Sequence, residues 1–130
     1  MNRIITNTKT FLSRENLNNL NSFHSNEWIQ YLKFNHQKYS RNLVFENDFY
    51  KMYVLCWLPR QKTPIHDHPG NGCMFKIVQG ELEETLYDGN SNLLATKTHY
   101  VDDFTSIKNK LHAMENKSNN YSVSLHIYSE

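Results

Sequence analysis

From position 39 onward the chain consists of short segments rich in β-branched and aromatic residues, separated by polar or glycine-containing turns. Such segments favour strands, and turns at this spacing are typical of a β-sandwich or barrel. The tripeptide Asp88-Gly89-Asn90 predicts a hairpin. The strands that we predict are Asn42–Phe45, Phe49–Leu58, Cys73–Gln79, Glu81–Tyr87, Leu93–Tyr100, Leu111–Glu115 and Tyr121–Ser129. This pattern predicts a mainly β fold.

The residues before these strands have helical character. Ser25 can cap a first turn, and a weaker apolar pattern runs from Ser13 through Leu20. The apolar residues that recur on one helical face are Trp28, Tyr31 and Leu32. Because 130 residues can bury one core but hardly two, we expect a single domain. In it, short helices of residues 1–38 would pack on a β-domain of residues 39–130.

Charge and hydropathy exclude several classes of protein. Lys and Arg number 14 against 13 Asp and Glu, and no stretch forms a basic stripe, so we predict no nucleic-acid partner. Residues 1–10 lack a signal-peptide core, and no window approaches the roughly 20 apolar residues of a membrane span. We therefore expect a cytoplasmic monomer without a membrane contact. In a reducing compartment Cys56 and Cys73 would remain thiols.

The last predicted strand has two chemically different faces. One is wholly apolar and the other is polar, and they consist of Val123, Leu125 and Ile127 and of Ser124, His126 and Tyr128, respectively. The polar face could lie in water, as in a half-exposed strand. Alternatively it could line the interior of a barrel whose apolar face is covered from outside. The pattern alone leaves both interpretations open.

Two histidines, His66 and His68, project to the same side of an extended segment. They make half of a metal site, although ordinary surface histidines can have the same spacing. A third imidazole is available at His112, on a later predicted strand. Imidazole ligands permit zinc, iron, nickel or copper.

The order of these residues resembles the two sequence motifs of the cupin superfamily of small β-barrels. The shared features are a His-x-His pair, Gly80 after a turn, and a distant histidine with Asn116 shortly after it. In cupins these histidines converge on one metal inside the barrel, which implies a jelly-roll barrel here. Most cupins add a glutamate ligand beyond the second histidine, and Cys73 occupies that position.

More specifically, residues 39–130 resemble the cysteine dioxygenases, the thiol-oxidising branch of the cupins. Residues 1–38 resemble that family only in their helical character, without matching motifs. The resemblance is carried by Tyr39–Val44, Cys56-Trp57, Ile65–His68, Cys73–Asp88, Leu111-His112 with Glu115-Asn116, and Ser122–Ser129. It implies Fe(II) held by His66, His68 and His112. It also implies conversion of L-cysteine and dioxygen to cysteine sulfinic acid, with both oxygens going to sulfur.

A site of three neutral imidazoles supplies no negative charge, so the metal would attract an anionic ligand such as a thiolate. The resemblance implies that L-cysteine binds iron through its thiolate and its amine. Two alternatives remain: a dioxygenase of another small thiol such as 3-mercaptopropionate, or a non-catalytic metal-binding cupin. Arg41 favours cysteine, because related enzymes for 3-mercaptopropionate have Gln at that position.

The resemblance also suggests roles for residues around the metal. Arg41 would bind the substrate carboxylate with its planar guanidinium, supported by Tyr39 two positions away. Cys73 and Tyr128 match the positions that form a cysteine–tyrosine thioether in the animal enzymes. His126 would orient the hydroxyl of Tyr128, with Ser124 on the same face. The histidines without a predicted role are His24, His36 and His99.

Overall fold

The computed structural model describes residues 28–68, 72–107 and 110–129. The strands are β1 (Ser40–Glu46), β2 (Tyr50–Trp57), β3 (Cys73–Gln79), β4 (Glu81–Tyr87), β5 (Leu93–Tyr100), β6 (Phe104–Ile107), β7 (Leu111–Glu115) and β8 (Ser122–Ser129). They form a five-stranded sheet in the order β1-β2-β8-β3-β6 and a three-stranded sheet in the order β5-β4-β7. All strand pairs are antiparallel.

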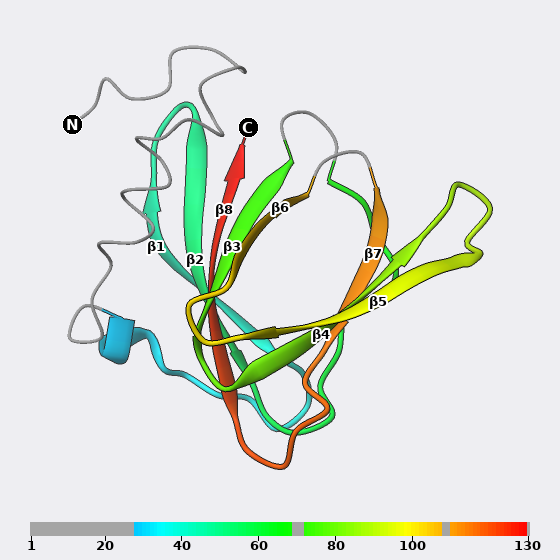
Figure 1. Ribbon diagram of the computed structural model, residues 1–130. Coiled ribbons are helices and arrows are strands. Elements are labelled where there is room, and N and C mark those ends of the chain that lie inside the picture. The colour runs from blue at the N-terminus through cyan, green and yellow to red at the C-terminus, as the bar shows by residue number, and fades with distance from the viewer. Residues whose placement is uncertain (1–27, 69–71, 108–109, 130) are drawn as a thin grey trace.

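The two sheets face each other as the walls of an open shell (Figure 1). Among the described residues no strand ladder joins one sheet to the other, so the shell is not hydrogen-bonded into a closed barrel. The chain crosses between the sheets at Gly80, which separates β3 from β4. Residues from both walls therefore meet in the space between them.

The predicted strands are confirmed, most of them at their predicted ends. β3, β4, β5 and β7 have the predicted bounds, and β1 is longer at both ends. Asp88 closes the predicted β4–β5 hairpin, because its carboxylate accepts hydrogen bonds from the backbone of Asn90 and Asn92. β6 was not predicted: its four residues directly follow the acidic pair Asp102-Asp103 and are too few for a clear alternation.

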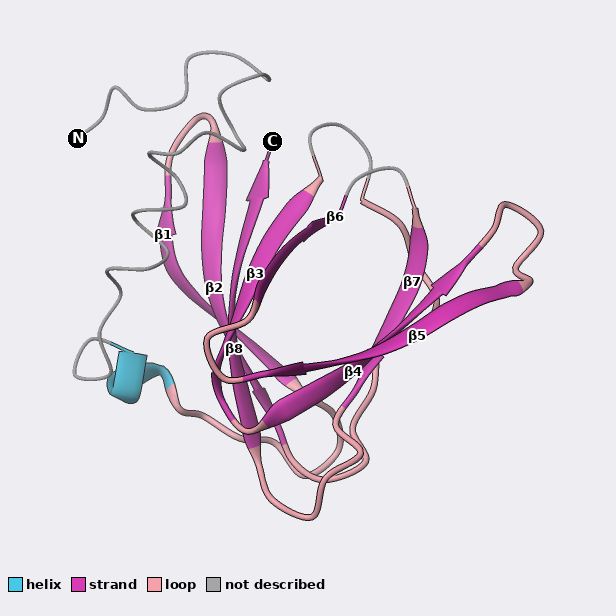
Figure 2. Ribbon diagram, in the orientation of Figure 1, coloured by secondary structure: helices cyan, strands magenta, loops and turns pink. Residues whose placement is uncertain are grey.

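The helix predicted around Ser25–Leu32 is described only from Trp28 onward, where Trp28 is helical and a 3₁₀ turn follows it. This turn is η2 (Ile29–Tyr31), which has no side-chain cap. The predicted apolar residues Trp28, Tyr31 and Leu32 pack on the outer face of the five-stranded sheet. Figure 2 shows η2 outside the five-stranded sheet, on the side away from β4, β5 and β7. The predicted Ser25 cap and the segment Ser13–Leu20 lie outside the described residues. Within the part of the chain that the structure describes, no helix is long and apolar enough to span a membrane.

The five-stranded sheet has an apolar core on each face. The outer core includes Trp28, Tyr50, Met52, Val54, Met74, Val123, Leu125 and Ile127, and the inner core consists of Leu55, Trp57, Phe75, Ile77, Leu82 and Met114. The apolar face of β8 is thus covered from outside, partly by residues around η2. Ser124 and His126 are buried as well. Of the two interpretations of β8, the structure supports the one in which its polar face lines the interior.

Candidate metal centre

Three histidines from two chain segments meet between the sheets. His66 and His68 lie in the segment before β3, and His112 lies on β7. One ring nitrogen of each lies within 4.8 Å of the others, and the Nε2 atoms of His68 and His112 are 3.0 Å apart. The structure therefore brings together the three residues that the sequence suggested as metal ligands.

Backbone pairing places two of these histidines. The His66 N–H donates to the His112 carbonyl at 2.9 Å, and the His112 N–H donates to the His66 carbonyl at 2.8 Å. A second bridge joins Lys62 to Glu115, and the Thr63 N–H donates to the Met114 carbonyl. Residues 62–66 therefore run along the edge of β7, and this pairing places His66 beside His112.

Hydrogen bonds at Nδ1 determine which ring nitrogens can bind a metal. The Nδ1 of His66 lies 2.8 Å from the Pro64 carbonyl, and that of His112 lies 2.8 Å from Glu84 Oε2. Because both partners are acceptors, each Nδ1 is the donor, and in the neutral form of these rings the lone pair is therefore on Nε2. Burial and the neighbouring His112 lower the pKa of His68 to about 4, so this ring is neutral at pH 7. These donors fit a divalent metal ion.

A buried carboxylate supports the cluster, which sequence reasoning missed. Glu84 on β4 is 4% exposed, and its oxygens accept hydrogen bonds from His112 and from His99 on β5, each at 2.8 Å. Burial raises the pKa of Glu84, but the two histidine hydrogen bonds outweigh it and hold the pKa at about 2. The prediction that the imidazole ligands themselves supply no negative charge is unaffected, but a buried carboxylate lies directly behind one of them. The available signal was Glu84 itself, an acid between Leu82 and Leu86 on one face of a strand.

The polar face of β8 forms a chain of hydrogen bonds. The indole N–H of Trp57 donates to Ser124 Oγ at 3.0 Å, and Ser124 Oγ lies 2.8 Å from His126 Nε2. The indole of Trp57 can only donate, so Ser124 Oγ accepts from it and can either donate to or accept from His126 Nε2. The other ring nitrogen of His126, Nδ1, lies 3.4 Å from the Tyr128 hydroxyl and 3.8 Å from Cys73 Sγ.

Arg41 and Tyr39 reach the same region from the start of β1. The Arg41 guanidinium lies over the rings of Tyr53 and Tyr128, at 4.3 and 5.2 Å from their centroids. Tyr39 stacks on Trp57 with centroids 4.6 Å apart. His36 is exposed and does not line either of the two cavities that contain Tyr39 in their walls. His24 lies outside the described residues.

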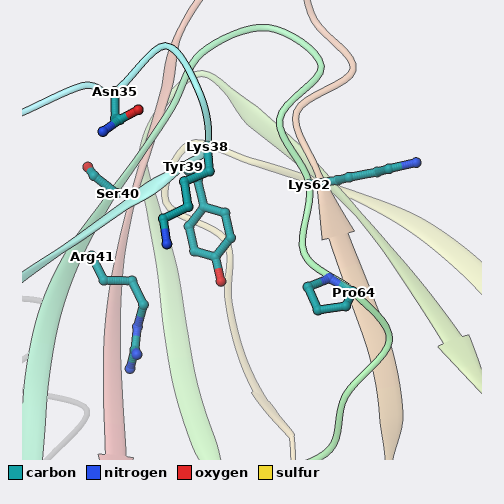
Figure 3. A pocket seen from close by; sticks show the side chains of 7 residues that line it. All are labelled: Asn35, Lys38, Tyr39, Ser40, Arg41, Lys62 and Pro64. Carbon is teal, nitrogen blue, oxygen red and sulfur yellow. The ribbon is translucent and has the colours of Figure 1, made fainter.

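Two adjoining cavities share Tyr39. The inner one is lined by the three clustered histidines together with Cys73, His126 and Tyr128, and its free volume of about 20 Å³ holds roughly one water-sized group. The outer one, of about 540 Å³, is lined by Asn35, Lys38, Tyr39, Ser40, Arg41, Lys62 and Pro64. Figure 3 shows the side chains of Tyr39 and Arg41 pointing the same way on one side of the outer cavity, with Pro64 opposite them. The outer cavity is large enough for a small organic molecule and carries cationic groups.

Comparison with solved structures defines the class of fold. A cupin superfamily protein from Desulfitobacterium hafniense DCB-2 superposes with a TM-score of 0.64 and 15% identity, covering 77% of this chain and 84% of that one. A protein with a double-stranded β-helix domain from Klebsiella pneumoniae gives a TM-score of 0.64 and 17% identity, covering 75% and 82%. The chain therefore has the cupin fold, and this prediction is confirmed.

Sequence comparison then defines the branch of that superfamily. The family model "Cysteine dioxygenase type I" matches residues 11–130. Cysteine dioxygenase type 1 from Danio rerio is 36% identical over 129 residues, covering 86% of this chain and 62% of the relative. The Homo sapiens protein of that name is 37% identical over 117 residues, covering 79% and 56%. The chain belongs to the cysteine dioxygenase type I family, and it spans between 56% and 62% of the length of these curated relatives.

Proposed function

We propose that the protein is an iron(II)-dependent dioxygenase that converts L-cysteine to cysteine sulfinic acid. One thiol and one dioxygen molecule combine, so both oxygen atoms end on sulfur and no external reductant is needed. The observation that carries the proposal is the convergence of three histidines beside Tyr128, over whose ring Arg41 lies, in a member of this family.

His66, His68 and His112 would hold the iron through Nε2, since the tautomers of two of the rings leave these lone pairs free. Bound iron(II) supplies the redox chemistry that lets dioxygen react with a thiolate. Three protein ligands leave room for a substrate to bind beside them.

Arg41 would hold the substrate carboxylate in a bidentate, charge-assisted pair. Its guanidinium lies over Tyr128, whose ring centroid is 5.4 Å from that of His68. A short amino acid held there directs its thiol and amine toward the histidines. Tyr39, beside Arg41 at the border of the two cavities, would add a hydroxyl contact to the carboxylate.

Tyr128 would place its hydroxyl beside the reacting sulfur. Burial and the neighbouring Cys73 raise the pKa of Tyr128, so the phenol keeps its proton at neutral pH. With its proton on Nδ1, His126 would donate to the Tyr128 oxygen, 3.4 Å away, and its Nε2 would accept from the Ser124 hydroxyl. In this arrangement the phenol hydrogen is free to point at the substrate.

The test is dioxygen uptake by protein loaded anaerobically with iron(II) and then mixed with L-cysteine. We expect one sulfinate per dioxygen consumed, and loss of both metal and activity in His112→Ala. The matched control is His36→Ala, which removes an exposed histidine outside both cavities. An iron-loaded wild-type chain that consumes no dioxygen with L-cysteine would refute the proposal.

A further inference from the structure

We propose that Glu84 is a positioning residue for the third metal ligand, with His99 as the group that holds its carboxylate in place. Glu84 would keep His112 in the tautomer that presents Nε2 to the metal and would add one negative charge behind that ring. This inference rests on metal binding by the histidine cluster, as proposed above.

The contacts of Glu84 are directional at both oxygens. Oε2 accepts from His112 Nδ1 and Oε1 accepts from His99 Nε2, each at 2.8 Å, so neither oxygen is left without a donor. The other nitrogen of His99 lies 3.5 Å from the Thr105 hydroxyl on β6. Because both oxygens of the carboxylate are hydrogen-bonded, its orientation is fixed. It can therefore fix the plane of the His112 ring and keep the ring proton on Nδ1.

The strand register explains why these three side chains meet. β4 is the central strand of its sheet and pairs with β5 on one side and β7 on the other. His99 is opposite Leu82 and His112 is opposite Leu86, each two residues from Glu84 along β4. Such diagonal neighbours on one face lie about 7–8 Å apart, within reach of long side chains. Glu84 therefore bridges two strands toward the interior.

The charge of Glu84 has a chemical consequence for the metal. A carboxylate hydrogen-bonded to a ligating histidine raises the basicity of that ligand and orients its ring. The carboxylate of Glu84 would act on the metal through the His112 imidazole and not as a ligand. This leaves the coordination position itself open to a substrate thiolate.

The experiment compares Glu84→Gln with Glu83→Gln, using cobalt(II) as the probe and a chelator in competition. A glutamine side chain at position 84 has nearly the same shape as glutamate but no charge, and we expect metal binding to weaken about 10–100-fold. Glu83 is the adjacent residue on β4, and its carboxylate pairs with Lys117 at 3.1 Å, away from the histidines. Glu83→Gln removes the same charge and should bind cobalt(II) within about twofold of wild type.

A second measurement needs no variant. Nitrogen-15 spectra of the histidine rings in the metal-free wild-type chain should show His112 protonated at Nδ1. Protonation of His112 at Nε2, or equal cobalt(II) affinity in Glu84→Gln and wild type, overturns the positioning role and leaves the proposed function standing. If the wild-type chain binds no metal at all, the proposed function fails and this inference fails with it.

Discussion

Cys73 on β3 lies directly opposite Tyr128 on β8 in the antiparallel register of the five-stranded sheet. Side chains of directly opposed residues leave the same face, with Cβ atoms about 4.5–5.5 Å apart. Both line the inner cavity, where Cys73 is a free, buried thiol. The sheet thus holds the sulfur beside the phenol without any contribution from a loop.

This pairing leads us to predict that turnover forms a thioether between the two residues. The Cys73 S–H and one C–H of the Tyr128 ring are lost and one S–C bond forms, while two electrons and two protons reduce dioxygen to hydrogen peroxide. Intact mass should then be lower by two hydrogen atoms after incubation with iron(II), L-cysteine and air. Cys73→Ser, treated identically, should keep its mass, and so should wild type kept without dioxygen. An unchanged wild-type mass after many turnovers would contradict the prediction.

Arg41→Gln should lower kcat/KM for L-cysteine by about 10–100-fold. The variant loses a charge-assisted hydrogen-bonded pair worth roughly 1.5–3 kcal/mol, and about 1.4 kcal/mol corresponds to tenfold. Its activity toward 3-mercaptopropionate relative to L-cysteine should rise, as measured by dioxygen uptake with each thiol. Arg60→Gln is the control, because Arg60 bonds to Ser118 and Asn119, outside both cavities. Equal losses in the two variants would argue against a role of Arg41 in substrate binding.

The stability of the metal-free protein should depend on pH through His126. Burial, together with nearby His68 and Arg41, lowers the pKa of His126 well below 6.5. Below pH 6.5 the unfolded chain therefore binds a proton at this residue that the folded chain does not, so stability falls as pH falls. The contribution of one such group is at most about 1.4 kcal/mol per pH unit. Urea unfolding between about pH 5 and pH 8 should show a shallower dependence below pH 6.5 for His126→Gln than for wild type.

Gly80→Ala should destabilise the fold by roughly 1–3 kcal/mol. Gly80 has φ +76°, and an added Cβ would lie 2.5 Å from Ser122 Oγ and 2.8 Å from the Tyr121 carbonyl. The turn between β3 and β4 would have to move, and with it the path of the chain between the two sheets. Gly89→Ala is the matched control, since nothing lies within 4 Å of its Cβ position. Thermal unfolding midpoints that fall equally in the two variants would show that the close approach at Gly80 is unimportant.

Much of the site could be predicted because it depends on alternation along single strands. Side chains alternate in direction along a strand, which places Ser124, His126 and Tyr128 on one face. The same alternation places His66 and His68 on one side of their extended segment. Glu84 and His99 escaped prediction because their importance depends on strand register. One acid on a strand does not indicate which histidines will lie diagonally from it on the two neighbouring strands.

By itself, the sequence determined the strands, their polar and apolar faces, and the chemical types available for the site, because these depend on local propensity and on a period of two residues. Only the tertiary structure decided which of those groups meet. The backbone pair between His66 and His112, and the carboxylate of Glu84 behind that second ring, join segments far apart in the chain. Such contacts are selected by the packing of two sheets and by hydrogen-bond register. They also explain why a site whose three ligands are imidazoles still contains a buried carboxylate.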